Sequence, residues 1–430
     1  MNSSSKLQVS SNWNRAVWAM AAAFGAYFCM YGFRKPFTAA TSENFGNLLL
    51  WGIDYKILIV TTQVLGYLLA KFIGIKVISE MPQQRRALSI LGMIAIAQLS
   101  LVIFGLIPAP WNFPLMFING LMLGMVFGLV MSFLEGRQVS ELLIAGLCSS
   151  FILADGVMKT VGTRVLQAGV SAYWMPAVAG TIFILPLLIS VWMLTRIPPP
   201  SDDDRNHRSN REPMSKHDRR EFFARYGMGL WLIVGVYVLT TILRSVRADF
   251  APEIWKSIGY SKAPDVFTTS EMYVALGIML VNGLGILIKT NRTAFFNSLG
   301  VSGFGFLLVI LGWIAYRSHF IGGFPLMVML GLGLYLPYVA IHTTVFERLI
   351  AWTRQRGNLG FLMYFADTMG YAAYVLVLLG KGLITSKDRV SELFPTLCII
   401  VALLSIVCLV AAGLYFRFKT IHTRAEQVAN

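Results

Sequence analysis

Long apolar blocks recur along the whole chain and constrain its fold more than any other feature. Six occupy roughly residues 15–40, 55–79, 86–108, 111–135, 141–168 and 175–196, and six more occupy roughly 227–256, 268–290, 293–316, 323–350, 358–384 and 392–418. A helix needs about 20 apolar residues to cross the hydrocarbon core of a bilayer. Lipid offers no partners to backbone polar groups, so a spanning segment must satisfy them internally as a helix. The sequence therefore predicts an all-α, multi-pass membrane protein of twelve transmembrane helices.

The composition agrees with this prediction and excludes other classes. Hydrophobic residues make up 56% of the 430-residue chain and charged residues only 13%, which is too little charge to cover a soluble protein of this size. The net charge of +15 does not indicate nucleic-acid binding, because the basic residues flank the apolar blocks. The four cysteines lie in apolar blocks without metal-ligand spacing, so we expect no metal and no other cofactor.

One polar stretch divides the blocks into two groups of six. It begins with prolines at 198–200, continues with aspartates at 202–204 and then becomes strongly basic. A segment of this kind cannot bury itself and is typical of a surface linker. We therefore predict a first six-helix bundle over 1–198, a linker over 199–225 and a second bundle over 226–430.

The distribution of lysine and arginine predicts the orientation. Most of them fall in the linker and in loops on one predicted side, such as those at Arg85–Arg86 and Lys289–Arg292. The positive-inside rule makes that side cytoplasmic, and an even number of spans places both termini there. The first block shows no convincing cleavage site for a signal peptide. The expected location is a bacterial inner membrane.

A weak internal repeat relates the two groups of blocks. Glu135 precedes Asp155 by 20 residues, and Glu347 precedes Asp367 by the same spacing, with 212 residues between corresponding positions. Together with the six-plus-six pattern, this spacing favours an origin by duplication.

Two arginines stand where a charge is costly in a membrane protein. Arg34 ends the first block beside Lys35, with Tyr31 just before it, and Arg244 lies well inside the seventh block. Arg34 and Lys35 could snorkel to the outer interface, but Arg244 is too deep to do so comfortably. In a duplicated fold the first and seventh helices face a common cavity, so we expect Arg34 and Arg244 to converge. Two guanidinium groups repel each other unless an anion lies between them, which suits a phosphate or a carboxylate. We therefore expect the solute to be bound by Arg34, Lys35, Arg244 and Tyr31.

Short motifs around these arginines are similar to those of a known family. The stretch Tyr31–Gly32–Phe33–Arg34–Lys35–Pro36–Phe37 resembles the first-helix signature of the organophosphate:phosphate antiporters of the major facilitator superfamily. The stretch from Arg244 to Pro252 and the segment Ala70–Lys71–Phe72 are similar to two further motifs of that family. The resemblance implies a major facilitator fold of two pseudo-symmetric six-helix bundles, whose midplane site opens to each side in turn. It also implies exchange for phosphate, and proton symport is the rival coupling.

Asp155 departs from that family, which has a histidine on its fifth helix at the matching place. An anion there would repel phosphate unless it were protonated or paired, and Lys159 one turn later can neutralise it. Asp155 and Lys159 are therefore either an intrahelical ion pair or a cavity site that changes protonation during transport. The chain also resembles a group of bacterial membrane proteins of unassigned function that branch from the same superfamily.

Two other polar residues lie inside the later blocks. Asp367 has no cation one turn away, and burial favours the neutral form of a carboxyl group, so Asp367 is a candidate for proton coupling. His342 follows Tyr338 by one turn. Tyr338 and His342 are candidates for lining the solute cavity. The alternative for His342 is a hydrogen bond between helices.

Charged residues also stand at the predicted cytoplasmic ends of the fourth and tenth blocks. Glu135 with Arg137, and Glu347 with Arg348, are interpreted as latches that close the inner gate. Further candidates for the cavity lining are Gln63, Tyr67, Glu271 and Asn282.

The sequence thus predicts a monomeric secondary active transporter that moves a small anionic solute such as an organophosphate or organic acid. Phosphate or protons would be the coupling species. A membrane enzyme is disfavoured, because the blocks carry no catalytic constellation and the loops are short. The alternative is a sensor or scaffold that has a transporter fold and binds its ligand without moving it.

Overall fold

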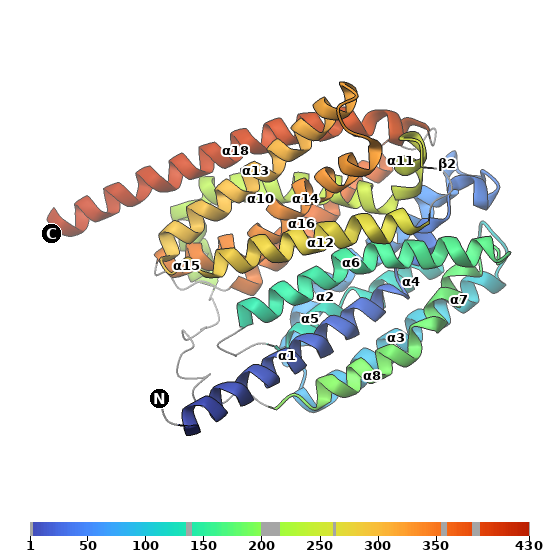
Figure 1. Cartoon of the computed structure of the whole chain (residues 1–430), viewed down its shortest axis with the longest axis horizontal. Helices are drawn as coiled ribbons and strands as arrows, with labels where there is room; N and C mark the ends of the chain where they lie inside the picture. The colour runs from blue at the N-terminus through green and yellow to red at the C-terminus, as the bar shows by residue number, and fades with distance from the viewer. Residues whose placement is uncertain are drawn as a thin grey trace. The chain divides into compact units, whose positions relative to one another are not determined.

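The chain is almost entirely helical, as the apolar blocks predict (Figure 1). The structure is a computed structural model and describes residues 3–134, 140–198, 216–260, 264–353, 359–380 and 388–429. Within these residues, each of the twelve predicted blocks overlaps one or more helices.

Among the described residues, the first six blocks contain the helices α1 to α8. Their bounds are α1 (Ser3–Tyr31), α2 (Tyr55–Glu80), α3 (Gln83–Leu106), α4 (Pro114–Leu123), α5 (Val126–Met131), α6 (Ser140–Gln167), α7 (Met175–Ile182) and α8 (Ile184–Thr195). Between α1 and α2 lie the 3-10 turns η1 (Pro36–Ala39) and η2 (Ser42–Phe45) and a small antiparallel hairpin. The hairpin pairs β1 (Leu49–Leu50) with β2 (Ile53–Asp54), in the register Leu49 to Asp54 and Leu50 to Ile53.

The later blocks form helices of more varied length. Their bounds are α10 (Lys216–Asp249), α11 (Ala251–Ser257), α12 (Asp265–Ile286), α13 (Asn291–Arg317), α14 (Gly323–Ala340), α15 (Phe346–Thr353), α16 (Leu359–Leu379) and α18 (Asp388–Ala429). A one-turn π-helix, η3 (Ile341–Val345), joins α14 directly to α15. The helix breaks at Phe250, between α10 and α11, and Pro252 stands in the first turn of α11, where the missing backbone hydrogen-bond donor of proline is tolerated.

Within the described residues, nine helical segments are long and apolar enough to cross a membrane, or ten if the bent pair α7 and α8 forms one span. The helix α6 is not in this set; it carries Asp155, Lys159 and Arg164. The multi-pass character is therefore clear, whereas the count of twelve spans stays a prediction.

The chain divides into two compact units. Unit 1 comprises 1–208, 247–279 and 375–391, and unit 2 comprises 209–246, 280–374 and 392–430. Unit 1 thus contains α11 and most of α12 in addition to the helices of the first block group. The predicted division at a 199–225 linker stays a prediction, since residues 199–215 lie outside the described part.

Glycines set the helix spacing in unit 1. A Cβ atom on Gly66 of α2 would lie 2.1 Å from the carbonyl oxygen of Phe117, and one on Gly120 of α4 would lie 2.0 Å from that of Gln63. Only residues without a side chain permit this approach of two helix backbones. A Cβ on Gly124 of α4 would likewise lie 2.5 Å from the Cβ of Ala70 on α2.

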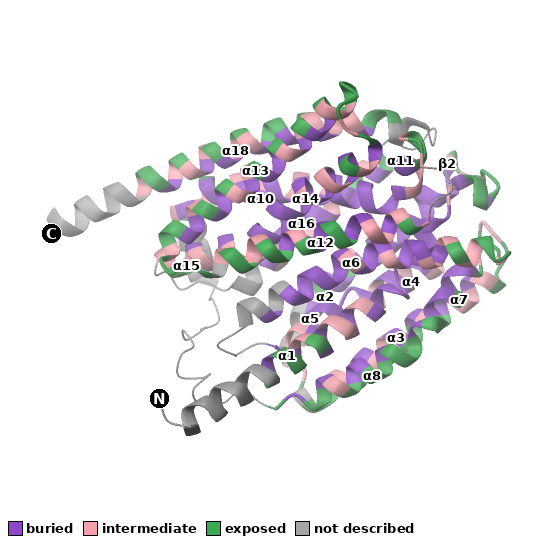
Figure 2. Cartoon of the chain, in the orientation of Figure 1, coloured by how far each residue is buried: buried purple, intermediate pink, exposed green. Residues whose placement is uncertain are grey.

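Exposed residues occur along helices of both units (Figure 2), and many of them are large and apolar. In unit 1 they include Leu99 on α3 and Leu185 on α8, and in unit 2 they include Leu311 on α13 and Val407 on α18. Aqueous solvent would penalise such surfaces, whereas lipid accommodates them.

Candidate functional site

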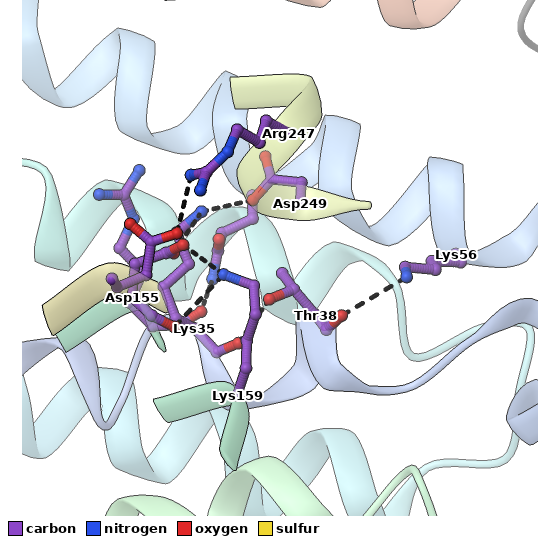
Figure 3. Close-up of polar contacts among 10 residues, drawn as sticks. Lys35, Thr38, Lys56, Asp155, Lys159, Arg247 and Asp249 are labelled. Carbon is purple, nitrogen blue, oxygen red and sulfur yellow. Dashed lines mark hydrogen bonds and ion pairs between the residues drawn. The ribbon is translucent and has the colours of Figure 1, made fainter. Parts of the chain in front are cut away.

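A group of oppositely charged side chains is buried in unit 1 (Figure 3). Lys35, just after α1, donates a hydrogen bond to Asp249 at the end of α10, and its Nζ lies 3.8 Å from Oδ1 of Asp155 on α6. Lys159, one turn further along α6, donates to the other carboxylate oxygen of Asp155. All four side chains are at most 9% exposed. Asp155 therefore binds two lysines, and its predicted pairing with Lys159 is confirmed.

Two more ion pairs extend this group. Arg247 Nη1 lies 2.7 Å from Glu271 Oε1 on α12, and Lys56 Nζ lies 2.6 Å from Glu253 Oε1 on α11. We call the eight residues the ionic cluster; they are Lys35, Lys56, Asp155, Lys159, Arg247, Asp249, Glu253 and Glu271. Four are cations and four are anions, so the cluster is formally neutral. Pairing of this kind offsets the large cost of removing charges from water.

A close contact between α6 and α12 continues from the ionic cluster. A Cβ on Gly156 would lie 2.4 Å from the carbonyl oxygen of Phe267. One turn later Thr160 donates to the carbonyl oxygen of Pro264 at 2.8 Å, and one turn after that Arg164 lies 2.6 Å from Asp265. We call this contact the α6–α12 seam. Its spacing of four residues keeps the three α6 positions on one helix face.

Arg34 lies in a different environment within unit 1. Its guanidinium carbon is 3.9 Å from the centre of the Tyr67 ring on α2 and 5.5 Å from that of Tyr31. Lys71 Nζ lies 5.2 Å from the same Tyr67 ring, and both cationic residues are buried. Aromatic faces stabilise cations electrostatically, more strongly where water is excluded. Gln63, which the sequence suggested as a lining residue, donates to the carbonyl oxygen of Arg34.

Arg244 has a similar environment within unit 2. Its guanidinium carbon lies 4.4 Å from the centre of the Tyr338 ring and 5.7 Å from that of Tyr335, both on α14. Arg244 is 8% exposed, compared with 5% for Arg34. Each unit therefore holds one buried arginine against two tyrosine rings. The expectation that the two arginines converge on one solute stays a prediction, because the units are described separately.

Asp367 lies near Tyr338, one of the two tyrosines that contact Arg244, in a cluster of polar side chains. Tyr237 of α10 donates a hydrogen bond to Asp367 Oδ1. The Tyr237 hydroxyl is also 3.3 Å from Nδ1 of His342, which is itself 4.0 Å from Asp367 Oδ1. All three side chains are buried. We call Tyr237, His342 and Asp367 the Tyr–His–Asp cluster.

Sequence reasoning identified several of these residues and missed others. It did not select Tyr237, which is one of 16 tyrosines, and it named Lys71 only within a motif. A lysine in the middle of an apolar helix was the available signal for Lys71. The structure also pairs Arg247 with Glu271 of another helix, a partner that the sequence did not indicate.

The predicted inner latches are only partly described. Glu135 and Arg137 lie outside the described residues. Glu347 lies in the first turn of α15, half-buried, and its neighbour Arg348 donates to the side chain of Asn291 at 2.9 Å. No grouping of three or more metal-ligating side chains occurs among the residues that the structure describes.

Comparisons with known proteins agree with this architecture. A family model described as "Family of unknown function (DUF5690)" matches residues 36–419. The comparison with curated proteins gave no match. The crystal structure of a D-xylose-proton symporter is similar, with a TM-score of 0.59 and 12% sequence identity, over 90% of this chain and 96% of the symporter. That symporter has the major facilitator fold, so the fold class predicted from the sequence is confirmed.

Proposed function

This chain belongs to the family of unknown function DUF5690, and we propose that it is a secondary transporter that moves a small anionic solute across a membrane by alternating access. The major facilitator fold supports a transporter rather than an enzyme. The observation that carries the proposal is the pair of buried arginines, Arg34 and Arg244, one in each unit, each held against tyrosine rings.

The chemistry of these two environments favours an anion. Stacking against a ring uses the flat face of a guanidinium group, whereas phosphates and carboxylates are bound along its edge by paired N–H donors. In unit 1, Lys71 adds a second cation on the ring that supports Arg34. Tyr31, Tyr338 and His342 complete the groups that we propose contact the solute.

We assign the ionic cluster and the α6–α12 seam to gating. The cluster joins Lys35 and α6 to the end of α10 and to α12, all within unit 1. Its charges are matched, so it does not need an added anion for neutrality. We therefore place Lys35, Asp155 and Lys159 with the gate rather than with the solute. Glu135, Arg137 and Glu347 keep their proposed role at the opposite, inner gate.

The coupling species separates two versions of this function. The motifs around Arg34 and Arg244 resemble those of organophosphate:phosphate antiporters, which favours exchange for phosphate. The similar D-xylose-proton symporter favours proton symport. Both versions share the same anion-binding arginines.

Uptake into proteoliposomes tests the function. Purified protein is reconstituted and supplied with radiolabelled sugar phosphate, inorganic phosphate or a dicarboxylate in separate assays. We expect uptake of at least one of them, and a loss of about tenfold or more in Arg34→Lys and Arg244→Lys, because lysine keeps the charge but lacks the paired donors. Arg196→Lys is the matched control, since exposed Arg196 also contacts an aromatic ring, at 5.4 Å from Trp192.

The same assay can reject the proposal. Equal uptake by wild type and both arginine variants would remove these residues from the solute site. Binding that raises the melting temperature without any flux would instead favour the sensor or scaffold, because a ligand that binds only the folded state stabilises it.

A further inference from the structure

The Tyr–His–Asp cluster of unit 2 has a chemistry that anion binding does not use. Three groups that can each hold or pass a proton meet at one hydroxyl, because Tyr237 contacts both Asp367 and His342. Tyr237 and Asp367 come from α10 and α16, whereas His342 comes from the π-helix η3. A π-turn inserts an extra residue into a helix and is often found at functional sites.

The surroundings of the cluster are aromatic and contain one cation. The rings of Tyr237, Tyr338 and His342 stack on one another. The ring centroids of Tyr237 and Tyr338 are 5.1 Å apart with an interplanar angle of 24°. The ring of His342 lies 6.2 Å from Tyr237 at 16° and 5.8 Å from Tyr338 at 11°. Asp367 also interacts electrostatically with Tyr338, which in turn interacts with Tyr371 and Arg244. The titratable or charged groups near the cluster include Tyr335, Tyr338, Tyr371 and Arg244.

We propose that Tyr237, His342 and Asp367 form the binding site for a transported proton. This inference rests on the proposed function and decides its coupling in favour of proton symport. It assigns the proton to unit 2 and not to Asp155 of unit 1, whose carboxylate is already bound by two lysines.

The proton balance of the cluster is simple. With Asp367 ionised and His342 neutral, Tyr237 donates to the carboxylate, and the cluster carries one negative charge. Uptake of one proton by the carboxyl group of Asp367 makes the cluster neutral without breaking any bond. The Tyr237 hydroxyl contacts both acceptors, so it can redirect its hydrogen and let the proton pass between them.

Arg244 connects this proton to the solute. Its guanidinium group lies over Tyr338, which stacks on both Tyr237 and His342. Removing a negative charge beside Arg244 makes its surroundings more favourable to an anion. Linkage then requires that the bound anion strengthens proton binding by the same factor. Proton and anion would bind together, as symport requires.

Infrared difference spectroscopy tests the proton site without any solute. Reconstituted protein is titrated between acid and alkaline pH, and the carbonyl band of a protonated carboxyl group is followed. We expect a titrating band that is absent from Asp367→Asn and present in Asp155→Asn. Tyr237→Phe, which keeps the ring, is expected to retain the band with a changed midpoint.

Two outcomes would overturn the inference. One is a carboxyl band that persists unchanged in Asp367→Asn, and the other is the absence of any titrating carboxyl band in the wild type. Unchanged midpoints in both Tyr237→Phe and His342→Asn would likewise show that Asp367 titrates alone and would remove the three-residue site.

A second measurement separates this inference from the proposed function. Sulfate serves as the probe, because its charge is constant over the pH range used. We expect sulfate to raise the melting temperature of the wild type more at acid than at alkaline pH, with about a tenfold difference in apparent affinity. Asp367→Asn is expected to bind sulfate with no such difference. Loss of sulfate binding in Arg244→Gln, with binding retained in Asp367→Asn, supports the anion site. Equal sulfate affinity at all pH values in the wild type contradicts the coupling of proton and anion.

Discussion

The ionic cluster of unit 1 and the Tyr–His–Asp cluster of unit 2 solve the problem of buried charge in different ways. In the ionic cluster each anion has a cation within 4.0 Å, and four charges of each sign cancel. In the Tyr–His–Asp cluster one carboxyl group is stabilised by a phenol and an imidazole. A matched set of ion pairs resists a change in protonation, because neutralising one member leaves its partner buried and uncompensated. The carboxyl group of Asp367 contacts a phenol and an imidazole, each of which can also form a hydrogen bond with its protonated form. The contrast suits a gate in one unit and a proton site in the other.

The largest effect is expected from removing the shared anion of the ionic cluster. Asp155→Ala leaves Lys159 without the carboxylate that it contacts and removes one of the two carboxylates around Lys35, which keeps Asp249. Breaking a buried pair on one side costs about 3–5 kcal/mol, so we expect a large fall in the melting temperature of the purified protein. The double variant Asp155→Ala/Lys159→Met is expected to recover part of this loss. A single variant as stable as the wild type would show that the pairing contributes no stability.

The next effect is expected at the α6–α12 seam. Gly156→Ala introduces a Cβ 2.4 Å from the carbonyl oxygen of Phe267 and 2.8 Å from Glu271, so the helices must separate. Overpacking of this kind costs about 1–3 kcal/mol. We expect a lower melting temperature of the purified protein. We also expect that a cysteine introduced as Thr268→Cys reacts faster with a thiol reagent when the seam is opened by Gly156→Ala. Gly235→Ala on α10 is the control, because nothing lies within 4 Å of its added Cβ, and there alanine should stabilise the helix slightly. Equal behaviour of the two variants would contradict a close seam.

A smaller effect is expected in the Tyr–His–Asp cluster itself. Tyr237→Phe removes the hydrogen-bond donor of Asp367 but keeps the stacked ring. A hydrogen bond to a charged group contributes about 1.5–3 kcal/mol, and protonation of Asp367 can offset part of that loss. We therefore expect the melting temperature of this variant to recover at acid pH. Tyr316→Phe on α13 provides a tyrosine control. A loss of stability that is the same at every pH would argue against a protonatable Asp367.

The smallest effect is expected from the exposed pair at the end of the seam. Arg164 and Asp265 are 2.6 Å apart, but their side chains are 62% and 68% exposed. Exposed ion pairs contribute at most about 1 kcal/mol and are screened by salt. Arg164→Ala should therefore change the melting temperature little, and less in high salt than in low salt. An effect comparable to that of Asp155→Ala would mean that exposure does not distinguish the two pairs.

The sequence indicated the fold and part of the candidate site for identifiable physical reasons. Apolar blocks of membrane-spanning length directly predict helices. Arg34, Arg244, Asp155 and Asp367 could be selected because charge inside such blocks is costly. The short-range pair of Asp155 and Lys159 followed from helical spacing.

Other features depend on tertiary structure and could not be read in this way. The pairs of Lys35 with Asp249 and of Arg247 with Glu271 join residues from different helices. Tyr237 is a common residue in an apolar helix, and only its contact with Asp367 distinguishes it. Pro337 lies four residues before the π-helix that carries His342, but a proline predicts a bend in a helix and not this geometry in particular. The convergence of Arg34 and Arg244, on which the anion-carrier prediction depends, stays a prediction.

The reciprocal glycine contacts between α2 and α4 have a consequence for motion. At Gly66 and Gly120 the two backbones touch so closely that any axial slip would drive side chains into main-chain atoms. α2 and α4 must then move together as one rigid body, whatever rearrangement accompanies a transport cycle. Two spectroscopic labels, one on each helix, would therefore keep a constant distance. That distance would serve as an internal reference for measuring the displacement of every other helix.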